Sequence, residues 1–424
     1  MALKQIDQDT IQPGGKRGLP GRTSFAIVNE NTAEAEQRLS TLEGGSGGVS
    51  ASIAALQAGL LEEAQTRAEL DDVLGARIDA EQIARQDADG ALAAIVGRLS
   101  GRNRIINGSH LIAQRATNKP VVDTGFNPQY HCVDRWYMAS AGTMMAMSQQ
   151  LFPAGQTAVP GNPATFLRVG SISNNSASAL AYTGQTVEDV RTFSGTNSVL
   201  SFWAKASSTR KMGVSTVQYF GAGGSADTNQ VWPVLNLTTE WQKFTVQIAL
   251  PSCAGKIIGA NNHVRLRLWI DVGSNYTNIA GVVGSQSGDF DIALVQWEDG
   301  DVPTAFEFEH PGDLLLRCYR YCYRYDQEAG NAFTLAMVLD ASSAIAFLNF
   351  AVPMRTKPSA RSVGALATIT DIGGSKPVTG ITLIPIGTNR IALTLASSGL
   401  TPAQSVYVGA PFGGAVSYIF DAEL

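Results

Sequence analysis

The hydrophobic pattern of the chain changes its period once, near residue 100. Between residues 49 and 101 apolar residues recur at spacings of three and four, and proline, tryptophan, tyrosine and phenylalanine are missing. Such spacing places apolar side chains along one face of a helix. From residue 102 onward apolar and polar residues alternate, which is typical of strands that bury one face. The sequence therefore predicts a long helix followed by β structure.

The apolar stripe of the predicted helix is narrow. Its members are Ile53, Leu56, Leu60, Leu70, Leu74, Ile78, Leu92, Ile95 and Leu99. A helix of about 50 residues would be about 75 Å long, and so narrow a stripe needs a partner helix to cover it. We expect an intermolecular coiled coil, most simply of identical chains, over residues 49–101. Two shorter helices folded back at Gly75 or Gly90 are the alternative, because glycine weakens a helix by about 1 kcal/mol.

The alternating part of the chain predicts two β domains. Clear strand patterns lie at Ser198–Ala206, Lys243–Leu250 and Val264–Val272, with glycine-rich turns such as residues 221–225 between them. Many short antiparallel strands with such turns favour a sandwich or jelly roll, here over residues 102–312. Further strand patterns predict a second β-sandwich over residues 313–424. The fold class is thus mainly β with an N-terminal helical coiled coil.

The first 48 residues are polar and rich in glycine, and they end in the run Gly44–Gly48. A glycine- and serine-rich run of this kind is typical of a flexible linker. We therefore expect residues 1–48 to be an extended segment.

Composition narrows the classes of function. The 424 residues carry a formal net charge of −5, so no excess of cations is available for a nucleic acid. No apolar run approaches the roughly 18 residues of a membrane span, and no signal peptide is visible. The four cysteines, Cys132, Cys253, Cys318 and Cys322, are too few for a disulfide scaffold. We expect synthesis in a reducing cytoplasm, no membrane insertion, and buried free thiols at Cys318 and Cys322.

Candidate catalytic chemistry is sparse. The densest acidic cluster comprises Asp289, Asp291, Glu298, Asp299 and Asp301. Glycosidases place two carboxylates about the scissile bond, but here we favour a solvated edge or a structural site over a catalytic pair. The four histidines show no zinc-binding spacing, and no nucleotide-binding glycine motif is present. The sequence predicts no enzyme activity, no cofactor and no metal site.

Binding chemistry is better represented, by aromatic residues near predicted loops. The candidates for receptor binding are Tyr219, Phe220, Trp232 and Tyr276 in the first β domain, and Tyr407 and Phe412 in the second. Trp136, Trp203, Trp241 and Trp269 fall within strand patterns and are expected in the core. Exposed aromatic rings serve sugars and protein partners alike, so the residues do not choose between a glycan and a protein receptor.

Several segments resemble a known family. The run Arg102–Gly108, which reads Arg-Asn-Arg-Ile-Ile-Asn-Gly, is followed by Gln114-Arg115 and by Asp134-Arg-Trp136. This order resembles the opening of a domain of tail-fibre and receptor-binding proteins of tailed bacteriophages, a jelly roll akin to carbohydrate-binding modules. Later segments agree with it, namely Leu200–Lys205, Trp241–Phe244, Gln296–Gly300 and Leu316–Tyr321. The matching segments span about half of the chain.

The resemblance implies an elongated homotrimeric fibre on the virion, at the tail tip or in a fibre. The N-terminal segment would dock on tail or baseplate proteins, the coil would be trimeric, and the β domains would contact the host. The receptor would be lipopolysaccharide, another glycan or a pilus, recognised without catalysis. A structural tail or baseplate component and a tail-associated polysaccharide depolymerase are the alternatives.

Overall fold

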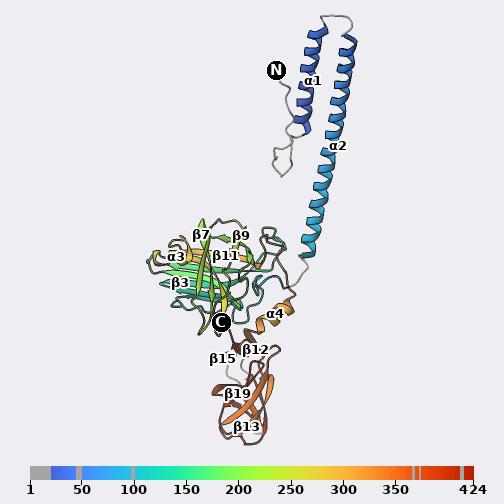
Figure 1. Cartoon of the computed structure of the whole chain (residues 1–424). Coiled ribbons are helices and arrows are strands. Elements are labelled where there is room, and N and C mark those ends of the chain that lie inside the picture. Colours follow the sequence, from blue (N-terminus) through green and yellow to red (C-terminus); the bar gives the residue numbers. More distant parts are fainter. Residues whose placement is uncertain (1–20, 44–49, 97–100, 365–367, 372–373, 411–414) are drawn as a thin grey trace. The chain divides into compact units, whose positions relative to one another are not determined.

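The computed structural model describes residues 21–43, 50–96, 101–364, 368–371, 374–410 and 415–424 (Figure 1). The chain divides into two compact units, Met1–Val96 and Gly97–Leu424.

The first unit is built from two helices that lie side by side, α1 (Gly21–Glu43) and α2 (Ser50–Val96) (Figure 1). Helix α2 confirms the predicted long helix and runs unbroken through Gly75 and Gly90, so the fold-back alternative is wrong. An extended segment was wrong for residues 21–43, where strong helix formers such as alanine, glutamate and arginine outweigh the overall polarity.

Half of the described members of the apolar stripe on α2 are exposed within one chain. Ile53 is 3% exposed, whereas Leu56, Leu70 and Leu74 are 54–61% exposed. Leu60 and Ile78 are half-buried. Leu92 and Ile95 belong to α2, but their side chains lie outside the described residues, as does Leu99 altogether.

The second unit begins with an antiparallel sandwich, which confirms a mainly β fold. Its core is formed by one apolar cluster between two sheets. In spatial order the six-stranded sheet contains β1 (Asn118–Val122), β3 (Thr143–Leu151), β4 (Thr165–Ser173), β11 (Gly288–Asp299), β6 (Asn197–Ala206) and β9 (Gln242–Ala249). The five-stranded sheet contains β2 (Tyr137–Ala141), β5 (Leu180–Glu188), β10 (His263–Val272), β7 (Arg210–Tyr219) and β8 (Thr228–Leu237).

Strict alternation along β10 decides which side chains face outward. Val264, Leu266 and Leu268 belong to the core cluster between the sheets. Because successive side chains of a strand point to opposite faces, Arg265 and Arg267 lie on the outer face of the five-stranded sheet. Part of this outer face is covered by the short helices η1 (Ser274–Tyr276) and α3 (Thr277–Ala280), whose residues pack on Trp269 and Tyr182.

The two ends of the sandwich are fastened to each other. Arg102 donates from Nε to Thr304 Oγ1 at 2.8 Å, and the Asn103 amide donates to a Glu307 carboxylate oxygen at 2.9 Å. Gly108 passes so close to β11 that a Cβ atom would lie 2.0 Å from the carbonyl oxygen of Val295, so only glycine fits. The first family-like motif therefore closes the sandwich.

The remainder of the second unit is a smaller β structure with its own core. It follows helix α4 (Pro311–Tyr319). A three-stranded sheet has the order β12 (Cys322–Gln327), β21 (Val416–Asp421) and β15 (Ser359–Gly364). A seven-stranded sheet has the order β17 (Gly374–Pro377), β16 (Thr368–Asp371), β20 (Ser405–Gly409), β13 (Ala332–Asp340), β14 (Ser343–Asn349), β19 (Arg390–Ala396) and β18 (Gly380–Pro385).

The outer side of the seven-stranded sheet carries an apolar face. Ala336 and Val338 of β13 point into the core, so the residues between them point outward. The members of this outer apolar face are 40–60% exposed: Leu335, Met337, Leu339, Phe347, Ile384 and Tyr407. Tyr407 lies directly opposite Leu335 in the register of β20 and β13.

Candidate functional site

A cleft of about 430 Å³ lies on the uncovered part of the outer face of the five-stranded sheet. We call it the arginine cleft. Its lining residues are Val217, Tyr219, Asp227, Asn261, His263, Arg265, Arg267, Arg355 and Leu424. The volume falls within the range of roughly 300–1,000 Å³ that is usual for sites of small ligands.

Strands β7 and β10 build the floor of the cleft. Their antiparallel register places Tyr219 opposite His263 and Val217 opposite Arg265. Directly opposite side chains on one face of a sheet are in contact, and here the rings of Tyr219 and His263 lie 4.7 Å apart and 31° from parallel. The half-buried Tyr219 ring thus presents an apolar surface beside two cations.

The two arginines of β10 have no carboxylate partner among the residues that the structure describes. Arg265 makes one polar side-chain contact, from its NH2 group to His263 Nε2 at 3.3 Å, and Arg267 makes none. The Nε atoms of both are buried without a hydrogen-bond acceptor. Charged groups removed from water normally gain a partner, so the two guanidinium groups differ from most of the partly buried arginines of this unit.

Aromatic rings hold the two guanidinium groups in place. The guanidinium carbon of Arg267 lies 5.4 Å from the ring centre of Tyr182 and 5.8 Å from that of Trp269. The guanidinium carbon of Arg265 lies 5.9 Å from the ring centre of Tyr137. Cation–π contacts of this kind stabilise a guanidinium at its face and leave the N–H groups at its edge free to donate.

The positive charge of the cleft at neutral pH comes from its arginines and not from His263. Burial, together with the neighbouring arginines, lowers the pKa of His263 to about 4, so the imidazole is neutral at pH 7. Arg355 uses its donors on main-chain oxygens of Ala422 (2.9 Å) and Glu423 (2.8 Å). Arg265 and Arg267 are therefore the cations available to a ligand.

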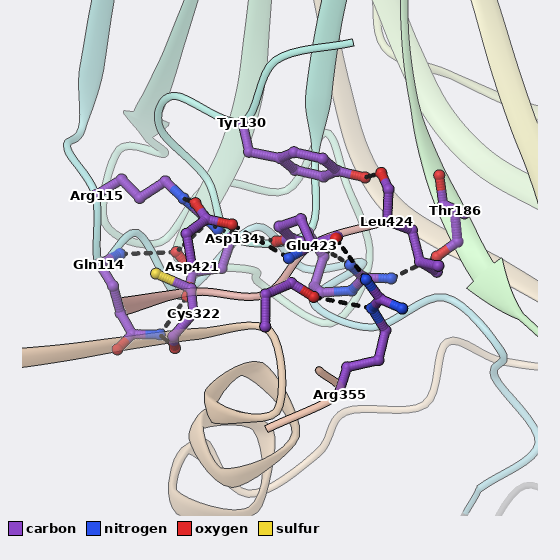
Figure 2. Close-up of polar contacts among 12 residues, drawn as sticks. Gln114, Arg115, Tyr130, Asp134, Thr186, Cys322, Arg355, Asp421, Glu423 and Leu424 are labelled. Carbon is purple, nitrogen blue, oxygen red and sulfur yellow. Dashed lines mark hydrogen bonds and ion pairs between the residues drawn. The ribbon is translucent and has the colours of Figure 1, made fainter. Parts of the chain in front are cut away.

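A buried ionic network joins the sandwich to the last strand beside the cleft (Figure 2). Arg115 contacts Asp421 at 2.9 Å, Glu423 at 3.1 Å and Asp134 at 3.7 Å. Arg135 pairs with Glu423 as well, and its guanidinium carbon lies 3.4 Å from the ring centre of Tyr321. The side chains of both arginines are 1% exposed. This network, together with Arg355, fixes Leu424 in the wall of the cleft.

The ionic network perturbs the groups that form it. Burial raises the pKa of Asp134 to about 6, although Arg115 and Gln114 oppose this effect. Burial alone would lower the pKa of Arg135, but the Glu423 carboxylate keeps that pKa above its usual value. Arg115, Asp134 and Arg135 come from the family-like motif, and Tyr321 ends another matching segment. These motif residues are structural.

The six aromatic residues predicted to bind a receptor lie in different environments. Tyr219 lines the cleft. Phe220 is 1% exposed and was wrongly predicted as a contact residue, because it points to the interior next to Tyr219. Trp232 packs on the sandwich core and donates to Thr216, and Tyr276 packs around Trp269 and against Phe126. Tyr407 is 60% exposed on the outer apolar face. Phe412 lies outside the described residues.

Of the tryptophans expected in the core, Trp136 and Trp269 are buried, whereas Trp203 and Trp241 are half-buried.

Two members of the acidic cluster are engaged in the sandwich. Asp291 accepts two hydrogen bonds from Arg168, at 2.7 and 2.8 Å, and Glu298 is 2% exposed and accepts from Thr304. Asp289 and Asp299 are exposed. Within the described ranges no group of three or more histidine, cysteine, aspartate or glutamate side chains is arranged to hold a metal ion. Cys318 and Cys322 are buried free thiols, as predicted.

Sequence reasoning missed the arginine cleft. The signal was present in the run Arg265-Leu-Arg-Leu, where cations occupy alternate positions of a strand in a chain with only 16% charged residues.

No helix in the described part of the chain is long and apolar enough to span a membrane.

Comparisons with known proteins give similarity to parts of solved structures. Neither a protein-family model nor a curated protein matches the sequence. The enzymatically active domain of tailspike protein 4 of bacteriophage CBA120 matches at 15% identity and a TM-score of 0.28, over 47% of this chain and 22% of that one.

Two sugar-binding proteins are similar over comparable lengths. A family 11 carbohydrate-binding module of Clostridium thermocellum, solved with a mixed-linked tetrasaccharide, matches at 11% identity and a TM-score of 0.26, over 44% of this chain and 98% of the module. A putative sugar-binding protein of Bacteroides thetaiotaomicron matches at 14% identity and a TM-score of 0.29, over 47% of this chain and 100% of that one. Because all these scores lie below 0.5, no function is transferred from these proteins.

Proposed function

We propose that the chain is a non-catalytic attachment protein of a tailed bacteriophage that binds a glycan of the bacterial surface in the arginine cleft. The observation that carries the proposal is the cleft itself, in which two arginines that form no ion pair with a carboxylate among the described residues lie beside the half-buried ring of Tyr219. A sugar needs both kinds of surface, since its ring faces are apolar and its edges carry hydroxyl groups. The resemblance of the sequence motifs to phage receptor-binding proteins supplies the biological setting.

Self-association belongs to the same proposal. Among the described residues, apolar side chains are uncovered on the stripe with Leu56, Leu70 and Leu74 on α2 and on the outer apolar face of the seven-stranded sheet. Exposed apolar surfaces of this extent are typical of protein interfaces. A homotrimer would cover the helix stripe, and three copies of a weak glycan site would raise the effective concentration at a cell surface. The N-terminal residues would join tail or baseplate proteins.

An array of bacterial surface saccharides tests the binding function with the full chain. Wild-type protein is expected to bind a subset of the array, and Tyr219→Ala is expected to weaken that binding about tenfold or more. Tyr407→Ala is the comparison variant, because Tyr407 is an exposed aromatic candidate and lies on the seven-stranded sheet.

The outcomes separate the alternatives. Absence of any bound saccharide would contradict the proposal and favour a purely structural tail component. Release of new reducing ends from a bound polysaccharide would show a depolymerase. Loss of binding in Tyr407→Ala but not in Tyr219→Ala would place the receptor site on the seven-stranded sheet.

A further inference from the structure

We infer that the ligand of the arginine cleft is an acidic sugar, whose carboxylate or phosphate group is bound by Arg265 and Arg267. This inference rests on the glycan-binding function proposed above and adds the charge of the ligand to it.

The spacing of the two arginines suits a single anionic group. They occupy positions i and i+2 of β10, on one face of the sheet, with their Cα atoms about 6.6 Å apart at the usual rise of a strand. Side chains as long as arginine can converge on one anion from that separation. A guanidinium binds a carboxylate or phosphate through two parallel N–H groups, which neutral hydroxyl groups cannot match in strength.

Among the described residues, neither cation forms an ion pair with a carboxylate, although Asp227 also lines the cleft. Other arginines of the second unit pair with a carboxylate. Arg168 donates two hydrogen bonds to Asp291, and Arg320 donates two to Glu188. Arg265 and Arg267 have aromatic rings at their faces instead. A neutral sugar would leave both charges uncompensated in a partly desolvated cleft, whereas an anion would compensate them.

The rest of the cleft suits the neutral part of an acidic sugar. His263 is uncharged at pH 7 and stacks on Tyr219. Asp227 lines the cleft and accepts from the Phe220 main-chain amide at 3.3 Å, and the Asn261 side-chain oxygen accepts from Arg355 at 3.1 Å. These groups can exchange hydrogen bonds with hydroxyl groups, while the Tyr219 ring covers an apolar ring face. The cleft thus has a cationic part and a part for hydroxyl groups.

The test uses an array that contains saccharides with uronic acids, saccharides with phosphate groups, and neutral saccharides. The strongest ligands of the full-length protein are expected to be acidic. For the best of them, Arg265→Gln and Arg267→Gln are each expected to weaken binding about 10- to 100-fold in calorimetric titration, the usual loss for one charge-assisted contact. Reduction of the ligand's carboxyl groups, or removal of its phosphate, identifies which anion is bound.

Arg390→Gln is the matched control, since Arg390 also contacts an aromatic ring, Phe347, but lies on the seven-stranded sheet. Wild-type binding of the acidic ligand is also expected to weaken between about 20 and about 500 mM salt, a readout that does not depend on any variant folding.

Strongest binding to neutral saccharides, or unchanged affinity in folded Arg265→Gln and Arg267→Gln, would overturn the inference. If such a ligand is still lost in Tyr219→Ala, the glycan function stands and only the charge assignment fails. If no saccharide binds at all, the proposed function itself fails.

Discussion

Glu423 is the carboxylate shared by the two buried arginines, and its neutralisation provides a sharp test of the ionic network. Glu423→Gln keeps the size of the side chain and removes the charge that faces Arg115 and Arg135, whose side chains are 1% exposed. Breaking a buried pair costs about 3–5 kcal/mol. We expect the lower end, about 3 kcal/mol, because Arg115 keeps Asp421 and Asp134.

Hydrogen exchange measured by mass spectrometry reports this loss locally, which suits a chain of several units whose unfolding is not a single transition. The Ala422 amide donates to the carbonyl oxygen of Tyr321 at 2.8 Å, so it is protected while the last strand stays attached. A loss of about 3 kcal/mol corresponds to exchange that is about 100-fold faster in peptides covering residues 415–424.

Asp299→Asn is the matched control, because Asp299 pairs with Arg104 at the surface. The Arg104 side chain is 46% exposed and that of Asp299 is 57% exposed. Such a surface pair contributes about 1 kcal/mol or less, and exchange at residues 415–424 should not change. Exchange in Glu423→Gln within threefold of wild type would refute the reasoning that the network fastens the last strand.

Two further predictions concern assembly and pH. Leu70→Glu is expected to turn the proposed trimer into single chains of 44.8 kDa in mass photometry. The control Gln65→Glu, on the opposite face of α2, is expected to leave the trimer intact. A Leu70→Glu protein that is still trimeric would contradict the coiled coil. Burial lowers the pKa of His110 to about 3 and of His263 to about 4, so each stabilises the fold above pH 6.5 and loses that stability by about 1.4 kcal/mol per pH unit as pH falls. Asp134 has a pKa raised to about 6 and acts in the opposite direction, because its protonation below pH 6 favours the folded state. Its contribution offsets that of one of the two histidines. The melting temperature should therefore fall between pH 6.5 and 4.5, and a rise over that range would count against these assignments.

The features that the sequence predicts well are those encoded in short stretches. Strands β6, β9 and β10 are visible as alternation, and α2 as a period of three to four, because burial of one face imposes these patterns locally. Tyr219 and Phe220 show the limit of such reasoning. Tyr219 ends β7 and Phe220 follows it, but neighbouring side chains point to opposite faces, and only the register with His263 decides which one faces the cleft.

Contacts between distant segments could not be predicted in this way. Arg115 and Glu423 are 308 positions apart, and nothing in either local pattern pairs them. Arg115 belongs to the family-like motif, whereas no pattern marked Glu423, and the structure gives both a structural role beside the last strand. The helix over residues 21–43 was missed because the polar composition of the N-terminal region obscured its few apolar positions.

The fastening of Arg102 to Thr304 and of Asn103 to Glu307 has a consequence for how such genes can change. The chain enters and leaves the sandwich at neighbouring points, so replacement of the intervening segment by another sandwich would leave the path of the flanking chain unaltered. Recombination at these two points would exchange the whole sandwich in one step. A replacement would have to retain Arg115, Arg135 and Glu188, because the downstream sheets attach through them.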